Sequence, residues 1–194
     1  MNIINGNQQL KIIIGTNLSP ENREWIANKL QKIISASAVK DLYMTYTLIG
    51  SKVKAITDFV APETAGEIYD YIKLQNGNLQ QITRIYLLSE VLTAAPEVFT
   101  SKIANLISVA DTGELEAFLK FMILLPAAEN YKNTAVDALR TNIATIFDAI
   151  AMNNPYPAKF FNHQQWNQMF LKAAFMERDL NQILAIDKLS LIHI

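Results

Sequence analysis

Apolar residues recur along most of this chain every three or four positions, which is the period of an α-helix and not of a strand. The segment 20–36 shows the pattern clearly, because its apolar positions fall on one side of a helix: Trp25, Ile26, Leu30, Ile33 and Ile34. The start of this segment is also marked, since Ser19 can cap the first turn and Pro20 suits the first helical position. The pattern therefore predicts a helix that begins near Pro20.

The same period predicts further helices over residues 40–49, 62–74, 79–93, 96–109, 111–125, 133–152 and 162–176, with a short one at 179–186. Asn76 and Gly77 form a helix-ending signal, and Asp111 and Glu114 have the spacing of a capping box. The best strand candidate is the β-branched run 10–14, but an isolated strand would have no partner for its backbone hydrogen bonds. We therefore expect a helix there as well.

Short helices joined by short links predict an all-α fold, arranged as an antiparallel helical stack. An α-solenoid of the HEAT type, an α-α superhelix, is one form of such a stack, although the chain shows no clean repeat of about 30–50 residues. The run 153–157, Asn-Asn-Pro-Tyr-Pro, is expected to form a turn or an extended link. No linker is long or polar enough to divide the chain, so we expect one helical domain over residues 1–194.

The composition adds one feature, because the chain is 51% hydrophobic and only 18% charged. Soluble domains usually contain about 25% charged residues. The surplus of apolar residues indicates a thick core, an apolar groove or a surface for a partner. The net charge of -1 and the lack of a basic tract argue against nucleic-acid binding, which needs many cationic side chains.

The sequence also limits where the protein is expected to be. No uncharged apolar run approaches the roughly 18 residues of a membrane span, so we expect a protein that is not embedded in a membrane. The segment 1–6 lacks the charged and apolar order of a signal peptide. Together with the absence of cysteine, these features favour a cytoplasmic location.

Familiar catalytic and metal-binding motifs are missing from the sequence. The two histidines, His163 and His193, lie in no H-E-x-x-H or E-x-x-H pattern, so we expect no metal site. The six glycines are too far apart for a phosphate-binding loop, and no serine lies in a G-x-S-x-G elbow. We therefore expect no cofactor, and the sequence disfavours an enzyme without excluding one.

One polar region stands out between the predicted helix 133–152 and the helix that follows the proline link. Its members form the predicted binding set: Arg140, Asn142, Asp148, Asn154, Tyr156, Trp166, Asn167 and Lys172. Arg140 and Asp148 lie two turns apart on one face of the expected long helix. If the two helices pack antiparallel, these polar groups converge. Two interpretations stay open: a buried Arg–Asp network that holds the corner with Trp166 in the core, or a pocket for a small ligand or a partner.

Five strings in this region resemble the C-terminal signature of the EboA family: Arg140-Thr141-Asn142, Phe147-Asp148-Ala149-Ile150-Ala151, Asn154-Pro155-Tyr156-Pro157-Ala158, Trp166-Asn167-Gln168-Met169 and Leu171-Lys172-Ala173. The segments 111–115 and 124–126 are similar to the part of the family that precedes it. The resemblance implies a setting, since EboA-like proteins are encoded in bacterial clusters with a UbiA-type prenyltransferase, a sugar-isomerase-like protein and a metal hydrolase. Such clusters have been linked to making or moving a secondary metabolite, and the resemblance implies no reaction.

These observations lead to a first hypothesis, to an enzyme as its alternative, and to a third interpretation, a purely structural scaffold inside a cluster complex. We expect a non-enzymatic helical accessory protein that binds a cluster-encoded partner protein or a small apolar metabolite in secondary-metabolite biosynthesis or trafficking. The alternative is an enzyme with an unfamiliar site around Arg140 and Lys172 that acts on a cluster intermediate. In that case Arg140 would hold an anion, and Lys172 or Tyr156 would move a proton.

Overall fold

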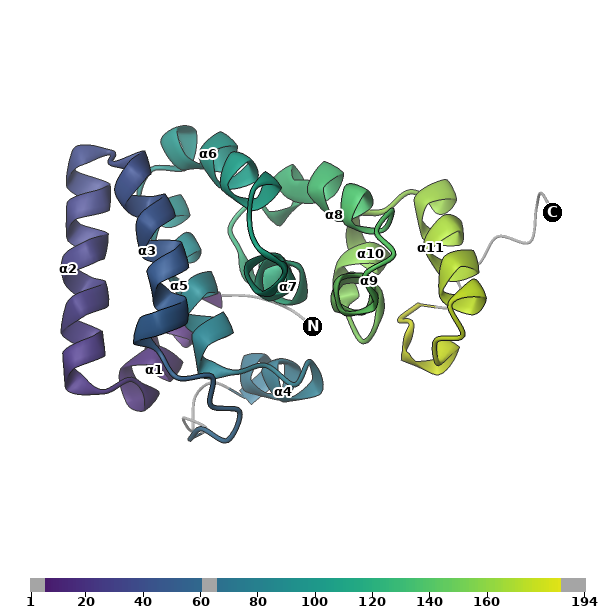
Figure 1. The fold of residues 1–194 in the computed structure, drawn as a ribbon, viewed down its shortest axis with the longest axis horizontal. Coiled ribbons are helices and arrows are strands. Elements are labelled where there is room, and N and C mark those ends of the chain that lie inside the picture. Colours follow the sequence, from purple (N-terminus) through teal and green to yellow (C-terminus); the bar gives the residue numbers. More distant parts are fainter. Residues whose placement is uncertain (1–5, 61–65, 186–194) are drawn as a thin grey trace.

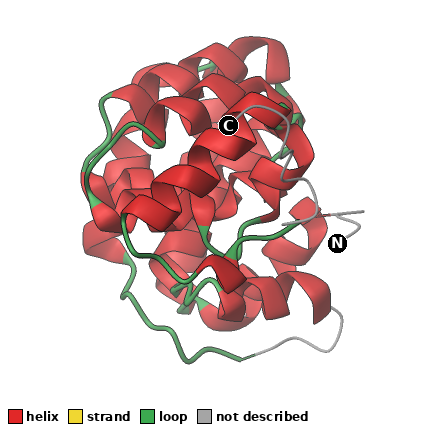
Figure 2. Ribbon diagram, turned by 90° about the vertical axis from the view of Figure 1, so that its right-hand side faces the viewer, coloured by secondary structure: helices red, strands yellow, loops and turns green. Residues whose placement is uncertain are grey.

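The computed structural model describes residues 6–60 and 66–185, and these residues form α-helices and short 3-10 helices with no strand among them (Figures 1 and 2). The α-helices are α1 (Gly6–Asn17), α2 (Pro20–Ala36), α3 (Val39–Lys52), α4 (Gly66–Leu74), α5 (Leu79–Ala94), α6 (Pro96–Ser108), α7 (Thr112–Phe121), α8 (Lys132–Ala138), α9 (Ala144–Ala151), α10 (Pro155–Phe160) and α11 (His163–Phe175). The 3-10 helices are η1 (Met122–Leu124), η2 (Ala128–Tyr131) and η3 (Leu180–Gln182). The predicted all-α class is therefore confirmed.

The structure contains the side-chain caps from which the helix starts were predicted. The Ser19 hydroxyl accepts a hydrogen bond from the Asn22 N–H at 3.2 Å. Asp111 and Glu114 form a reciprocal capping box at the start of α7, with distances of 2.8 and 3.2 Å. These caps satisfy backbone N–H groups that have no partner within the helix. The run 10–14, where a helix was favoured over a strand, lies inside α1.

The end of α4 also follows its sequence signal. Asn76 takes a left-handed φ of 48°, and the Gly77 N–H donates to the Ile72 carbonyl at 2.8 Å. A left-handed residue followed by such a bond closes the last turn of a helix. The predicted beginning of this helix at Pro62 lies outside the described residues.

The predicted long helix over 133–152 is wrong, because the structure divides it into α8 and α9. After α8 the Arg140 and Thr141 N–H groups donate to carbonyls three residues back, and the Thr141 hydroxyl accepts from the Ile143 N–H at 3.1 Å. A threonine side chain that bonds the nearby backbone competes with helix continuation. The polar pair Thr141-Asn142 therefore marks a corner between two short helices.

The proline link was also predicted incorrectly, since Pro155, Tyr156 and Pro157 begin the helix α10. Prolines fit the first turn of a helix, where the missing N–H would have had no partner. The Asn154 side chain accepts from the Tyr156 N–H at 3.0 Å and caps this turn. The helix predicted over 179–186 is reduced to η3 within the described residues.

The helix α5 lies in the middle of the first half of the molecule and is buried on nearly all sides. Twelve of its sixteen residues are buried, so it has no solvent face of its own. It packs against α1, α2, α3, α6 and α7. In a solenoid each repeat contacts only its neighbours, and a helix surrounded in this way does not follow that scheme. The HEAT-type form of the stack is therefore not confirmed.

Polar groups inside this core connect α3, α5 and α7. Arg84 on α5 is 5% exposed, and its Nε–H donates to the Tyr46 carbonyl at 3.2 Å. The Tyr46 hydroxyl in turn donates to the Glu114 carbonyl at 2.9 Å, and burial raises the pKa of Tyr46 above its ordinary value. Because buried polar groups destabilise a fold unless they are hydrogen-bonded, these contacts fix the relative positions of the three helices.

The second half of the molecule continues from α7 through α8, α9 and α10 to α11 (Figure 1). α7 packs closely against both α5 and α9, so it joins the two halves. One cluster of buried apolar side chains runs from Leu10 in α1 to Ile183 after η3. This continuity agrees with the expectation of one helical domain, which stays a prediction.

The close packing after α4 can be tested with two glycines. We expect Gly77→Ala to lower the free energy of unfolding by about 1–3 kcal/mol. The reason is that its new Cβ would lie 2.5 Å from Phe121 Cζ and 2.9 Å from Ile72 Cγ2. The matched control Gly15→Ala has nothing within 4 Å of the new Cβ, and it should raise the free energy of unfolding by about 0.5–1 kcal/mol. Urea unfolding followed by circular dichroism measures both, and equal stabilities would contradict the packing.

Candidate functional site

The structure does not bring Arg140 and Asp148 together. Arg140 lies after the end of α8, where its side chain is 78% exposed and pairs with Asp137 at 2.8 Å. Asn142 is exposed at the corner that follows. The break between α8 and α9 separates the two residues that were expected to share one helix face. The predicted Arg140–Asp148 network is therefore wrong.

Asn154 and Tyr156 are buried and hold backbone groups together. The Asn154 amide donates to the Leu119 carbonyl at 2.9 Å and to the Ala149 carbonyl at 2.8 Å. The Tyr156 hydroxyl donates to the Ala128 carbonyl at 2.8 Å, and burial raises the pKa of Tyr156. Because these polar atoms already have protein partners, both side chains act in the structure of the corner.

The members on α11 attach that helix to the rest of the molecule. Trp166 is 1% exposed and stacks on Phe170, so its predicted place in the core is confirmed. The Lys172 ammonium donates to the Leu139 and Thr141 carbonyls at 2.7 and 2.6 Å. These carbonyls follow the end of α8, where a cation is favourable. Asn167 is half-buried on the same helix.

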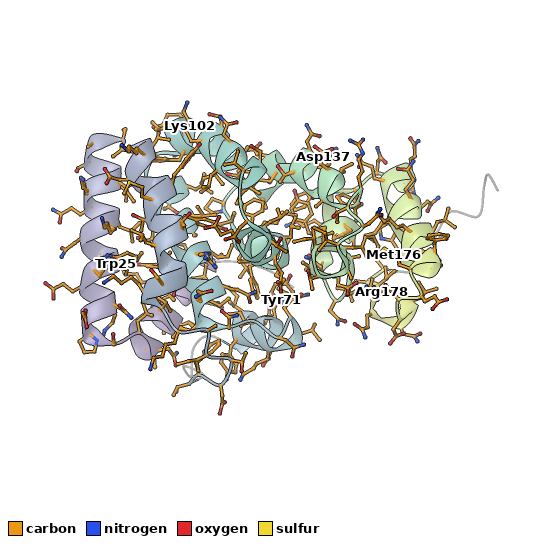
Figure 3. All side chains as sticks on the ribbon, viewed as in Figure 1. Trp25, Tyr71, Lys102, Asp137, Met176 and Arg178 are labelled. Atoms are coloured by element: carbon orange, nitrogen blue, oxygen red, sulfur yellow. The ribbon has the colours of Figure 1, made fainter. Side chains whose placement is uncertain are left out.

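Asp148 lines a cleft that the other members of the predicted set do not line. This polar cleft has a volume of about 370 Å³. Its polar lining comes from four parts of the chain: Gln75 after α4, Glu116 and Lys120 on α7, Asp148 on α9, and Arg178, Asp179 and Gln182 in the segment 177–185, which we call the C-terminal wall. Figure 3 labels Arg178 on this wall and Tyr71 on α4.

Two ion pairs lie in the polar cleft. Arg178 Nε lies 2.9 Å from Asp148 Oδ1 and forms an ion pair with it. Lys120 Nζ lies 2.7 Å from Glu116 Oε1, and these side chains are only 15% and 25% exposed. Charges shielded from water interact more strongly than surface charges. The cleft is therefore lined by paired donors and acceptors from α7, α9 and the C-terminal wall.

The backbone around the cleft is held by a buried amide. Gln75 is 6% exposed, and its Nε2–H groups donate to the Met152 and Asn153 carbonyls at 3.0 and 2.8 Å. The Asn153 N–H donates to the Gln182 carbonyl at 2.6 Å. Asn153 has a left-handed φ of 51°, which asparagine adopts more readily than most residues. These contacts tie α4, the end of α9 and the C-terminal wall to one another.

A second hollow adjoins the polar cleft and differs from it in character. This apolar shelf has a volume of about 570 Å³, and its apolar surface comes from Tyr71, Leu74, Pro155 and Leu184. Leu74 and Asn153 line both hollows. Leu74 is 51% exposed, whereas a large apolar side chain in a core would be buried. The two hollows therefore meet at Leu74 and Asn153.

Sequence reasoning missed most of the residues of the cleft. Glu116 and Lys120 have the i, i+4 spacing of an ordinary surface pair. Arg178 lies far along the chain from Asp148, and no local pattern connects them. A search for half-buried i, i+4 ion pairs on predicted core helices could have found the first pair, but only the fold reveals the second.

The described residues contain no group of three or more His, Asp or Glu side chains that could hold a metal ion. Among the same residues, no helix has the length and apolar character needed to cross a bilayer.

An all-α protein with a ligand-sized cleft is the class that this fold and site define. The chain belongs to the EboA family: the family described as "Metabolite traffic protein EboA" matches residues 6–192 of its 194 residues. The match extends well beyond the strings near the C-terminus that first suggested it. No curated protein and no solved structure matches the chain.

A substitution can distinguish a structural role of the buried Asn154 from a role in ligand binding. We expect Asn154→Ala to lower the free energy of unfolding by about 2–4 kcal/mol, because it leaves buried carbonyls without a donor. The matched control Asn142→Ala removes the same group from an exposed corner and should change stability by less than about 0.5 kcal/mol. Thermal and urea unfolding measure both. A stability of Asn154→Ala close to that of wild type would contradict the structural role.

The environment of Asp148 predicts a pH effect. Burial raises the pKa of Asp148, and the Arg178 charge offsets only part of the rise. Because the folded-state pKa is raised, ionisation of Asp148 weakens the folded state above that pKa, and this penalty is absent below the ordinary aspartate pKa of about 3.9.

Asp148→Asn should therefore gain stability relative to wild type as the pH rises from about 3.5 to 7. Urea unfolding of both proteins across this range measures the difference. A constant difference in the free energy of unfolding, or one that shrinks as the pH rises, would count against this environment.

Proposed function

We propose that this protein is a non-enzymatic helical accessory protein that holds a small metabolite in the polar cleft, in the biosynthesis or trafficking of a secondary metabolite. The observation that carries the proposal is the cleft itself, which is lined by two partly shielded ion pairs, one on α7 and one between α9 and the C-terminal wall. Its volume lies within the usual range of about 300–1,000 Å³ for small-molecule sites. The family description, which names metabolite traffic, supports a metabolite as the ligand.

The arrangement of charges favours binding over catalysis. A general acid or base needs a titratable group with a pKa near the working pH and within reach of the substrate. In the cleft each cation already lies against a carboxylate. Paired charges of this kind hold their positions and offer directed hydrogen bonds to a ligand, which is the task of a carrier.

The alternative enzyme around Arg140 and Lys172 finds no support in the geometry. The Lys172 ammonium is held by two backbone carbonyls, and Arg140 lies at the surface beside Asp137. The two residues therefore supply no shared site for an anion and a proton transfer.

A cluster-encoded partner protein remains a second candidate ligand. The observation that favours it is the outer face of α11, where Leu171 is 60% exposed and Phe175 is 88% exposed. Exposed apolar residues of this size are enriched in protein interfaces. A partner bound there would leave the polar cleft free, so both forms of the proposal are compatible with one molecule. We place this activity in the cytoplasm.

Native mass spectrometry of protein purified gently from its own host tests the proposal. We expect wild type to retain a small mass. Glu116→Gln and Arg178→Met should lose this mass, because each removes one charge of an ion pair in the cleft. The matched control Glu97→Gln changes an exposed carboxylate on α6, away from the cleft, and should retain the mass.

Circular dichroism confirms that each variant is folded before its spectrum is compared. Retention of the mass by both cleft variants, or its absence from wild type, would refute binding in the polar cleft. A co-purifying protein without a small mass would favour the partner form of the proposal.

A further inference from the structure

The polar cleft and the apolar shelf form one continuous groove of two chemical halves. They share Leu74 and Asn153, and Tyr71 lines the shelf. The Tyr71 hydroxyl donates to the Lys120 carbonyl at 2.5 Å, on the side of the cleft, while the residue also lines the shelf. A ligand that fills the cleft and extends past Leu74 would therefore pass from a polar surface to an apolar one.

The shelf exposes apolar side chains to water, so covering it with a ligand is energetically favourable. Leu74 is 51% exposed and Leu184 is 36% exposed, and Pro155 lies beside them. Covering apolar surface releases about 25 cal/mol for each Å² that is removed from water. An apolar ligand body on the shelf would therefore bind more tightly with every methylene that covers it.

The charges of the groove determine which net charge the polar half of the ligand can carry. Both cations of the groove, Lys120 and Arg178, are already paired with carboxylates. Its carboxylates outnumber these cations: Asp179 adds a further negative charge to the polar cleft, and Glu67 and Asp70 line the shelf. An anionic head would meet this surplus without a free cation to bind it. A neutral head with several hydroxyl groups can donate to the carboxylates and accept from the cations without breaking either pair.

We propose that the ligand of this groove is a neutral amphiphile, with a hydroxyl-rich head in the polar cleft and an apolar body on the shelf. This inference rests on the proposed function, because it names the chemical class of the metabolite that the cleft holds. The combined volumes of the two hollows, about 370 and 570 Å³, suit a ligand that is longer than either half alone.

A series of alkyl glucosides tests this class, with NMR titration of ¹⁵N-labelled protein below the micelle-forming concentration of each probe. Methyl glucoside presents the head alone, whereas hexyl and octyl glucoside add the body. We expect all three to shift resonances around the cleft. The dissociation constant should fall about fifteenfold from hexyl to octyl glucoside, since each of the two added methylenes contributes roughly a factor of four when buried.

Two variants separate the halves of the groove. Leu184→Asn should remove the dependence on chain length and leave methyl glucoside binding unchanged, because Leu184 lines the shelf and not the cleft. Glu116→Gln should weaken all three probes by a similar factor, because it alters the cleft and not the shelf. The matched control Val109→Asn removes a 77% exposed apolar side chain from a different hollow, between α3 and α6, and should behave as wild type.

The outcomes distinguish a failure of the proposed ligand class from a failure of the proposed function. Three results would overturn the proposal of a neutral amphiphile. They are an affinity that does not depend on chain length, no binding of octyl glucoside, and equally tight binding of anionic octyl sulfate. If the protein from its host still retains a small mass that the cleft variants lose, the proposed function stands with another class of ligand. If no such mass is retained, the proposed function fails as well.

Discussion

The side chain of Asn154 holds together the two helices that form the walls of the cleft. Its amide donates to the carbonyl of Leu119 on α7 and to that of Ala149 on α9. The next residue on α7 is Lys120, and the residue before Ala149 is Asp148, so one buried amide fixes a member of each ion pair. Because a buried amide must satisfy its donors, the spacing of α7 and α9 has little freedom. The geometry of the cleft depends on this contact more than on the charges that line it.

The ion pair between Asp148 and Arg178 is arranged at some cost to the fold. Burial raises the pKa of Asp148 even though Arg178 lies 2.9 Å away, which means that the pair does not fully offset the loss of hydration. The C-terminal wall that carries Arg178 is attached by this pair, by the bond from Asn153 to Gln182, and by the buried Ile183. A wall with few apolar anchors can adjust to a ligand at a small energetic cost. Charge pairs that add little stability are more easily understood as parts of a binding site.

The sequence predicted the local features of this fold and missed the ones that depend on distant contacts. Ser19, the Asp111–Glu114 pair and the Asn76-Gly77 ending could be found because a cap acts within one turn. The break at Thr141 was hidden, because the apolar period continues across it and the decisive bond comes from a short side chain. The start of α10 was misread because prolines mark both links and first turns. Arg178 could not be paired with Asp148 without the fold, since nothing in their spacing connects them.

The strings that resemble the EboA family describe mainly the frame of the site, and of their residues only Asp148, Ala149 and Pro155 line the groove. Asn154 and Tyr156 bond buried carbonyls, Trp166 packs in the core, and Lys172 closes the end of α8. Of the residues in these strings that were predicted to bind a ligand, only Asp148 lies in the polar cleft. Buried polar residues with fixed partners give recognisable strings, because few other side chains can make the same bonds. The groups that distinguish one ligand from another lie elsewhere, on Glu116, Lys120, Arg178 and Leu74, where many side chains would preserve the fold. The family resemblance therefore identifies the architecture that positions the groove, while the chemistry of the ligand has to be deduced from the residues that the fold brings to it.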